Sequence, residues 1–167
     1  MAHQNSHQNG PLQLVRAPDR PQFTGKKSVF LAGTTSKVGD EPDWRDSLTR
    51  QLSRLPITVI NPIPPNWVDW PEEISFKPFR EQVEWELDMQ EKADIVLIYY
   101  GPHTLAPISL LELGLCAPTK KAIVCCDKEY KKRGNVQIVA RRYGLEFLEN
   151  KRDMAAAVIR KLGSLEN

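Results

Sequence analysis

The sequence predicts an α/β fold in which helices cover both faces of a five-stranded parallel sheet. The first observation is a set of five short apolar runs, typical of buried strands, at residues 28–33, 57–62, 94–100, 121–126 and 145–148. The second is that each run is followed by a longer segment with apolar residues at helical spacing. Strands that alternate with helices in this way form a parallel sheet with right-handed crossovers.

The length of the chain, 167 residues, fits a single domain with a substantial core. Residues 1–26 are rich in Gln, Asn, His and Pro, which predicts a disordered or loosely attached N-terminal arm. The strand and helix alternation occupies residues 27–167. Within the arm, the apolar alternation at residues 12–15 leaves two alternatives, an edge strand or a segment that docks on a partner subunit.

Composition argues against several classes of function. The 23 basic side chains nearly balance the 21 acidic ones, so a surface for a nucleic-acid polymer is not indicated. No apolar run approaches the length of a membrane span, and the polar N-terminus lacks the apolar core of a signal peptide. The three cysteines show neither a disulfide framework nor metal spacing, and a solvated tail explains His3 and His7 better than a metal site. We therefore expect a cytoplasmic protein without a bound metal.

The segment at residues 107–117 contains the most informative residue. Read as a helix, the segment has apolar side chains almost all round, with Ile108, Leu111 and Leu115 on one side, so we expect a buried helix. Glu112 is its only carboxylate, and no lysine or arginine lies three or four positions away. A buried carboxylate must be paired, protonated or facing a cavity. It is either a structural glutamate, at an exposed edge or held by a distant arginine, or a functional one at the carboxyl edge of the sheet.

Three loops follow the first, third and fourth predicted strands and are expected to meet at this edge, at residues 33–43, 101–106 and 127–135. The first loop, rich in small and hydroxyl side chains, suits a phosphate or sugar, and Asp43 is expected to cap the helix at 44–55. The loop lacks the dinucleotide and P-loop patterns, so no such cofactor is expected. Another long loop, 63–78, contains Trp67 and Trp70, which would wall a planar ligand or cover the sheet edge.

The helix predicted at residues 79–93 contains a second carboxylate of interest. Its apolar residues are Phe79, Val83, Leu87 and the pair Met89 and Ala93. Glu86 shares a different side with Gln82 and Gln90. The pattern alone favours a solvated face for this glutamate over a functional one.

The two glutamates belong to a pattern that resembles a known family. Glu86 is followed by Ala93-Asp94-Ile95-Val96 and then by Leu110-Leu111-Glu112-Leu113-Gly114, while the first strand ends in Phe30-Leu31-Ala32-Gly33. Over about residues 27–162 this arrangement resembles the nucleoside 2-deoxyribosyltransferase-like family, including its nucleotide N-glycosidase relatives. The resemblance implies a flavodoxin-like three-layer sandwich, a catalytic domain at residues 27–167, and cleavage or exchange of the N-glycosidic bond of (deoxy)nucleosides.

The resemblance also implies roles for single residues. Glu112 falls on the family's nucleophile, and Glu86 stands where a second acid holds the sugar or helps the base to leave. Ala106 takes the position of an aspartate that protonates the base in transferases, which leaves His103, Glu86 or a water as the acid and weakens a transferase relative to a hydrolase. The residues expected to bind the substrate are Gly33, Thr34, Thr35, Asp43, Asn61, Trp67, His103, Ser109 and Asn135. Family sites are often completed across a subunit interface near the position of Asn135, so a homodimer or larger homo-oligomer is expected.

The chemistry is consistent with these roles and needs no cofactor. An N-glycosidic bond breaks through an oxocarbenium-like state that a carboxylate stabilises or captures, and the departing base takes a proton from a group with a raised pKa. A glycosyl-enzyme would then pass its sugar to a free nucleobase or to water. Two alternatives remain, a nucleoside 5′-monophosphate N-glycosidase and a non-catalytic nucleotide-binding module in which Glu112 is structural.

Overall fold

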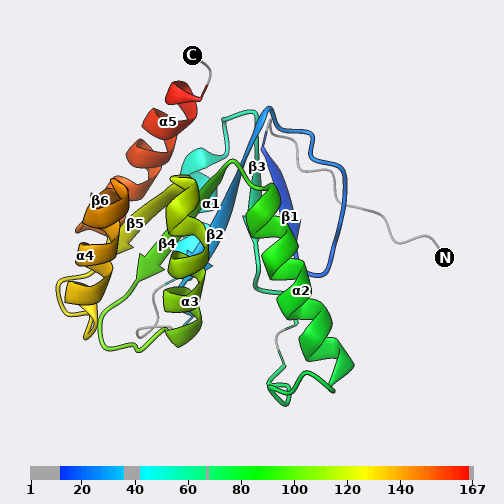
Figure 1. Ribbon diagram of the computed structural model, residues 1–167. Helices are drawn as coiled ribbons and strands as arrows, with labels where there is room; N and C mark the ends of the chain where they lie inside the picture. The colour runs from blue at the N-terminus through cyan, green and yellow to red at the C-terminus, as the bar shows by residue number, and fades with distance from the viewer. Residues whose placement is uncertain (1–11, 36–41, 67, 166–167) are drawn as a thin grey trace.

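A computed structural model describes residues 12–35, 42–66 and 68–165 of the chain. These residues form a six-stranded parallel sheet in the order β1-β3-β2-β4-β5-β6. Helices lie on both faces of the sheet, so the predicted three-layer α/β fold is confirmed (Figure 1). The strands are β1 (Gln13–Arg16), β2 (Lys27–Gly33), β3 (Ile57–Asn61), β4 (Ile95–Tyr100), β5 (Ala122–Cys126) and β6 (Glu146–Leu148).

The sixth strand comes from residues that the sequence assigned to the N-terminal arm. β1 pairs in parallel with β3, with Leu14 opposite Val59, and Val15 is buried. The Gln13 amide oxygen accepts a hydrogen bond from the Thr58 hydroxyl at 2.8 Å, which ties this edge strand to its neighbour. The edge-strand alternative for this segment is therefore correct, and the prediction of five strands was one too few.

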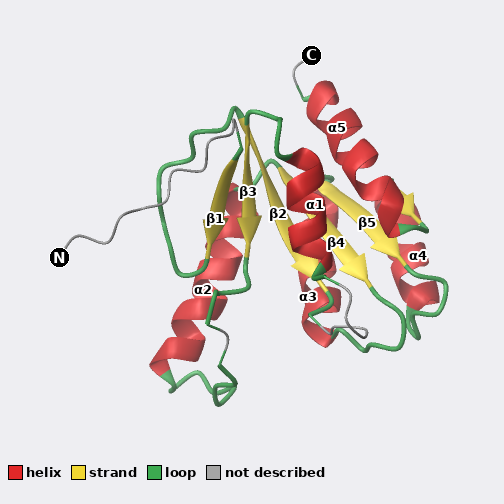
Figure 2. Ribbon diagram, turned by 180° about the vertical axis from the view of Figure 1, so that it is seen from behind, coloured by secondary structure: helices red, strands yellow, loops and turns green. Residues whose placement is uncertain are grey.

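The helices divide between the two faces of the sheet. Figures 1 and 2 show α2, α3 and α4 on one face and α1 and α5 on the other, each face with its own apolar core. The helices are α1 (Trp44–Leu52), α2 (Lys77–Lys92), α3 (Pro107–Cys116), α4 (Arg133–Tyr143) and α5 (Met154–Ser164), with short 3-10 turns η1 (Ala117–Thr119) and η2 (Lys151–Asp153). Asp43 caps α1 as predicted, since its carboxylate accepts a hydrogen bond from the Arg45 N–H.

The cysteines and the helices bear on two further expectations. All three cysteines are free and buried, as expected of small core residues. Within the described ranges, no helix combines the length and the apolar character that crossing a membrane requires.

The prediction that α3 is buried all round was wrong. Its buried residues are Ser109, Glu112, Leu113 and Cys116. The opposite side is open, with Ile108 59%, Leu111 61% and Leu115 53% exposed. α3 belongs to an outer layer of the sandwich, so the sheet covers only the side that faces it, whatever the composition of the other side.

Of the apolar residues predicted for α2, the pair Met89 and Ala93 is buried, but Leu87 is not. The buried residues of α2 are Gln82, Trp85, Met89 and Gln90. Leu87, expected inside, is 40% exposed, whereas the Trp85 ring is 1% exposed. Burial of this one large ring sets the rotation of the helix, because it outweighs the smaller side chains of the alternative stripe. The side of α2 that contains Gln82, Glu86 and Gln90 therefore faces inwards. The prediction that Glu86 lies on a solvated face was wrong.

Candidate functional site

Two carboxylates, of Glu86 on α2 and Glu112 on α3, lie on the sides of these helices that face each other. The Gln90 amide nitrogen donates a hydrogen bond to Glu112 Oε1 at 2.6 Å, which links α2 to α3. The Gln82 amide nitrogen donates to Glu86 Oε1 at 2.8 Å and to the Pro62 carbonyl oxygen at 2.9 Å. Each glutamate is thus held by one glutamine of α2.

The surroundings make both carboxylates weaker acids than they are in water. Burial, and next the negative charge of Glu86, raise the pKa of Glu112 to about 7, against the opposing charge of Arg45 and the hydrogen bond from Gln90. Burial also raises the pKa of Glu86, against the hydrogen bond from Gln82 and the charge of Arg45. Neighbouring carboxylates with raised pKa values are typical of acid–base and nucleophilic sites, because near neutral pH one is available as an acid and the other as an ion.

The positive charge near this pair belongs to Arg45 on α1. Its side chain is 1% exposed, and the guanidinium donates to the backbone carbonyls of Leu31 at 3.0 Å, Gly33 at 2.8 Å and Thr34 at 3.1 Å. Desolvation lowers the pKa of Arg45 only to about 10, so the group stays charged at neutral pH. Arg45 therefore holds the end of β2 in place and favours the ionised form of both glutamates. The hydrogen bond that Glu112 accepts comes from an amide rather than from this guanidinium.

The end of β2, where the first predicted loop begins, is tightly held. Gly33 has a φ of +126°, and a Cβ atom there would lie 2.2 Å from the Tyr99 carbonyl oxygen, so the position requires glycine. Thr34 is 5% exposed. Its N–H donates to the Tyr99 carbonyl at 2.8 Å, and its hydroxyl accepts from the Gly101 N–H at 3.0 Å. These bonds give Thr34 a structural role at the sheet edge, while the neighbouring Thr35 is exposed.

Asp43 and Asn61, both expected to bind the substrate, have backbone partners. Asp43 accepts from the Arg45 N–H at 2.8 Å, and its second oxygen lies 3.9 Å from the guanidinium of the same residue. Asn61 at the end of β3 is 2% exposed, and its amide oxygen accepts from the Ile63 N–H at 3.0 Å. Trp67 lies outside the described residues.

Three other predicted residues follow β4 and β5. Ser109 is buried in the first turn of α3, and its carbonyl accepts from the Tyr100 hydroxyl at 2.7 Å. His103 is exposed, and its Nε2 lies 3.4 Å from a carboxylate oxygen of Glu129. Asn135 is exposed in the first turn of α4. Because β2, β4 and β5 are adjacent and parallel, the expected meeting of their loops at one edge is confirmed for the described parts of those loops.

Sequence reasoning missed three residues that act on the two glutamates. For Gln82 and Gln90 a signal was present, since their four-residue spacing around Glu86 places all three on one side of a helix. That this side is buried follows only from the position of Trp85. Arg45 lies in an amphipathic helix, where a charged side chain is ordinarily solvated, and nothing in the local sequence distinguishes it.

The described residues contain no group of three His, Cys, Asp or Glu side chains placed to hold a metal ion. Comparison with protein families shows that residues 26–130 match the family described as "Nucleoside 2-deoxyribosyltransferase like". The matched range runs from the residue before β2 to the loop after β5 and includes Arg45, Glu86 and Glu112. A search of curated proteins gave no match to this chain.

Proposed function

Because this chain belongs to the nucleoside 2-deoxyribosyltransferase-like family, we propose that it cleaves or exchanges the N-glycosidic bond of nucleosides or nucleotides. The observation that carries the proposal is the buried Glu112, whose pKa is raised to about 7 beside a second carboxylate, Glu86. A nucleophile for the sugar and an acid for the departing base are the two groups that this reaction needs.

In the proposed first step, ionised Glu112 attacks C1′ of the sugar and forms an ester bond to it, while the bond between C1′ and the base nitrogen breaks. The electron pair of the broken bond stays with the base, which takes the one proton that the two carboxylates share, in the form of the pair that has it on Glu86. In the second step a nitrogen of another nucleobase, or a water, attacks C1′ and releases Glu112 as a carboxylate. Glu86 takes up the proton that the acceptor loses, so both glutamates return to their starting states.

Glu86 is proposed as the acid because the two other candidates fit the role less well. Burial raises the pKa of Glu86, which favours the protonated form that a proton donor needs. His103 is exposed and lies beside Glu129, and Ala106 brings no ionisable group to the start of α3. The alanine favours a second candidate function, hydrolysis with water as the acceptor, as in a nucleoside 5′-monophosphate N-glycosidase.

The test is to incubate the full chain with a panel of deoxyribonucleosides, ribonucleosides and their 5′-monophosphates, each with and without a second free base. Chromatography then separates the products. Exchange of the base identifies a transferase, and release of free base together with free sugar, or with sugar 5-phosphate from the monophosphates, identifies a hydrolase. Binding of a nucleoside or nucleotide without turnover would contradict the proposal and support the non-catalytic module.

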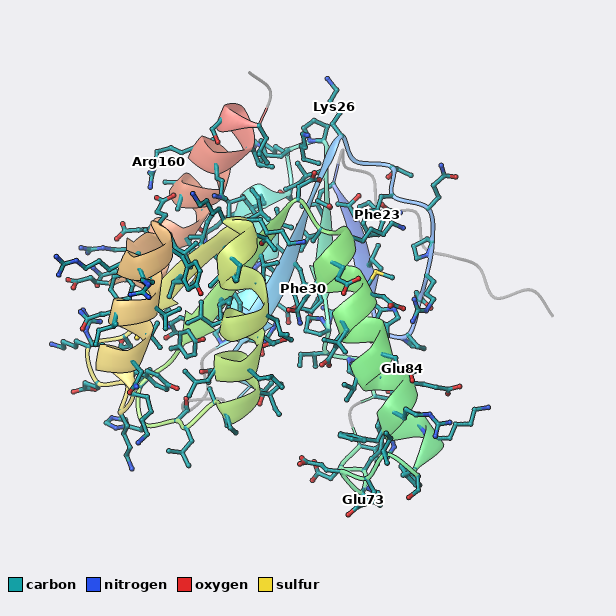
Figure 3. All side chains as sticks on the ribbon, in the orientation of Figure 1. Phe23, Lys26, Phe30, Glu73, Glu84 and Arg160 are labelled. Atoms are coloured by element: carbon teal, nitrogen blue, oxygen red, sulfur yellow. The ribbon has the colours of Figure 1, made fainter. Side chains whose placement is uncertain are left out.

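The matched variants are Glu112→Gln and Glu84→Gln. The first is expected to lower turnover by more than about a thousandfold, because it removes the nucleophile without changing the shape of the side chain. The second changes an exposed carboxylate on α2 (Figure 3) and is expected to leave turnover unchanged. Full activity of Glu112→Gln would remove the mechanism.

We also propose that the protein works as a homodimer or a larger homo-oligomer. Support comes from the open apolar side of α3 and the loop before it, where the exposed fractions are Leu105 60%, Ile108 59%, Leu111 61% and Leu115 53%. Contiguous apolar surface of this kind marks interaction sites, and a two-fold axis would bring the same side of two copies together. Sedimentation analysis should find a dimer or larger species that Leu111→Lys dissociates and that Ile74→Lys, a change at another exposed apolar residue, does not. A monomeric wild type would contradict this proposal.

A further inference from the structure

The contact between Gln90 and Glu112 joins two buried polar side chains from different helices. Gln90 is 6% exposed and Glu112 is 8% exposed, and the amide nitrogen of the first lies 2.6 Å from Oε1 of the second. An ionised carboxylate only accepts hydrogen bonds, so the amide must be the donor when Glu112 is ionised. A donor directed at an ionised acceptor makes a strong hydrogen bond in such a setting.

We propose that Gln90 is a positioning residue for the nucleophile: its amide holds Glu112 by Oε1 and leaves Oε2 as the atom that attacks C1′. The inference rests on the proposed function, in which Glu112 forms the glycosyl-enzyme. Gln90 does not touch the reacting atoms, and acts by limiting the rotation of the carboxylate. Nucleophiles held in this way approach the attack geometry without the entropy cost of ordering them in each turnover.

The backbone of Gln90 is itself fixed. Lys121, in the turn before β5, donates from Nζ to the carbonyl oxygens of Gln90 at 2.6 Å, Glu91 at 2.9 Å and Ala93 at 3.1 Å. A cation on the last carbonyls of a helix is a favourable cap. The buried neighbours Met89 and Ala93 pack in the core beneath α2. The Gln90 amide therefore points toward α3 from a part of α2 that is fixed in two ways, by the bonds from Lys121 and by the packing of Met89 and Ala93.

A neutral amide suits this position because Glu112 already has several ionisable neighbours. Glu86 from α2 opposes its ionisation and Arg45 from α1 favours it, while Tyr100 from β4 and Cys116 from α3 interact with its charge. A carboxylate in place of the amide would add a second opposing charge. A lysine would hold Glu112 in an ion pair and reduce its nucleophilicity. Gln90 supplies a donor without altering the charge of the site.

The test compares the wild type with Gln90→Met, which keeps the length of the side chain and removes the donor. With the substrate found in the panel above, kcat is expected to fall about tenfold to a hundredfold, as for loss of a hydrogen bond to a charged group, with a smaller change in KM. The acid limb of the kcat profile is expected to move to higher pH, because the lost bond favoured the ionised form of Glu112. Gln90→Glu is expected to move it further.

A second measurement needs no turnover. Carbon-13 NMR of glutamate carboxyl groups, with the Glu112 signal assigned by its loss in Glu112→Gln, gives the titration midpoint of Glu112 directly. Gln90→Met should raise that midpoint, and Gln137→Met, at an exposed glutamine on α4, should leave it unchanged. An unchanged midpoint in folded Gln90→Met would overturn the inference whether or not the wild type is active. An inactive wild type with a shifted midpoint would instead defeat the proposed function and leave the hold on Glu112 demonstrated.

Discussion

Glu112→Gln should make the protein more stable at neutral and alkaline pH, although it removes the proposed nucleophile. In the folded protein, burial and next the charge of Glu86 raise the pKa of Glu112 from 4.5 to about 7. Between these values the unfolded chain releases the proton of Glu112 while the folded chain keeps it, so folding stability falls as the pH rises. The difference between the two pKa values corresponds to about 3 kcal/mol, which is fully lost from wild-type stability above about pH 7.

Glutamine has the shape of glutamate and can still accept the Gln90 hydrogen bond, but it has no charge to bury. The free energy of unfolding of Glu112→Gln should therefore exceed that of the wild type by about 3 kcal/mol more at about pH 8 than at about pH 4. The assay is urea denaturation of both proteins across this range, followed by circular dichroism. Glu84→Gln, at an exposed position, should show no such pH-dependent gain.

The opposite result would refute the reasoning. If Glu112→Gln were less stable than the wild type at about pH 8, the ionised carboxylate would be a net stabilising group in the folded protein. Arg45 and Gln90 would then stabilise the ionised form of Glu112 by more than burial and the charge of Glu86 destabilise it, and its pKa would not be raised.

Three further changes test how the site is built. Gly33→Ala should cost more than about 3 kcal/mol of unfolding free energy, because its Cβ would lie 2.2 Å from a backbone oxygen of the neighbouring strand; Gly114→Ala, with nothing within 4 Å, should be neutral or stabilising in the same urea assay. Lys121→Met should cost about 1–2 kcal/mol of unfolding free energy, because it removes the bonds to the end of α2. Lys120→Met, at an exposed position, should cost little, and equal effects of the two changes would contradict the capping role. Arg45→Met should cost more than about 3 kcal/mol of unfolding free energy, since three backbone carbonyls lose a buried donor. It should also raise the titration midpoint of Glu112 measured by NMR. A stable variant with an unchanged midpoint would show that the charge of Arg45 has no influence on the site.

Much of the fold could be predicted from local pattern. A strand buried on both faces needs a largely apolar run, and the five short runs that the sequence assigned to strands correspond to β2 through β6. Asp43 predicted the start of α1, because a capping side chain accepts a hydrogen bond from the backbone only two residues away. β1 remained one of two alternatives, because a four-residue edge strand is recognised by the neighbour that it pairs with rather than by its own composition.

The candidate site was predictable only in part. Glu112 could be singled out because a lone carboxylate in an apolar helix is costly wherever that helix packs. Glu86 was identified by resemblance, while its own helical pattern pointed to solvent. Gln82, Gln90 and Arg45 were missed, because each matters through a partner whose position the local sequence does not reveal.

The sequence by itself determined the alternation of strands and helices, the edge at which the loops meet, and the presence of a carboxylate that the apolar helix α3 would have to accommodate. Only the tertiary structure decided which side of α2 and of α3 faces inwards. The rotation of a helix about its axis depends on what packs against it, and in α2 the burial of Trp85 outweighs the apolar stripe that ends in Leu87. The pairing of Gln90 with Glu112, and of Arg45 with the end of β2, likewise joins residues far apart in the chain, so it exists only once the layers have come together.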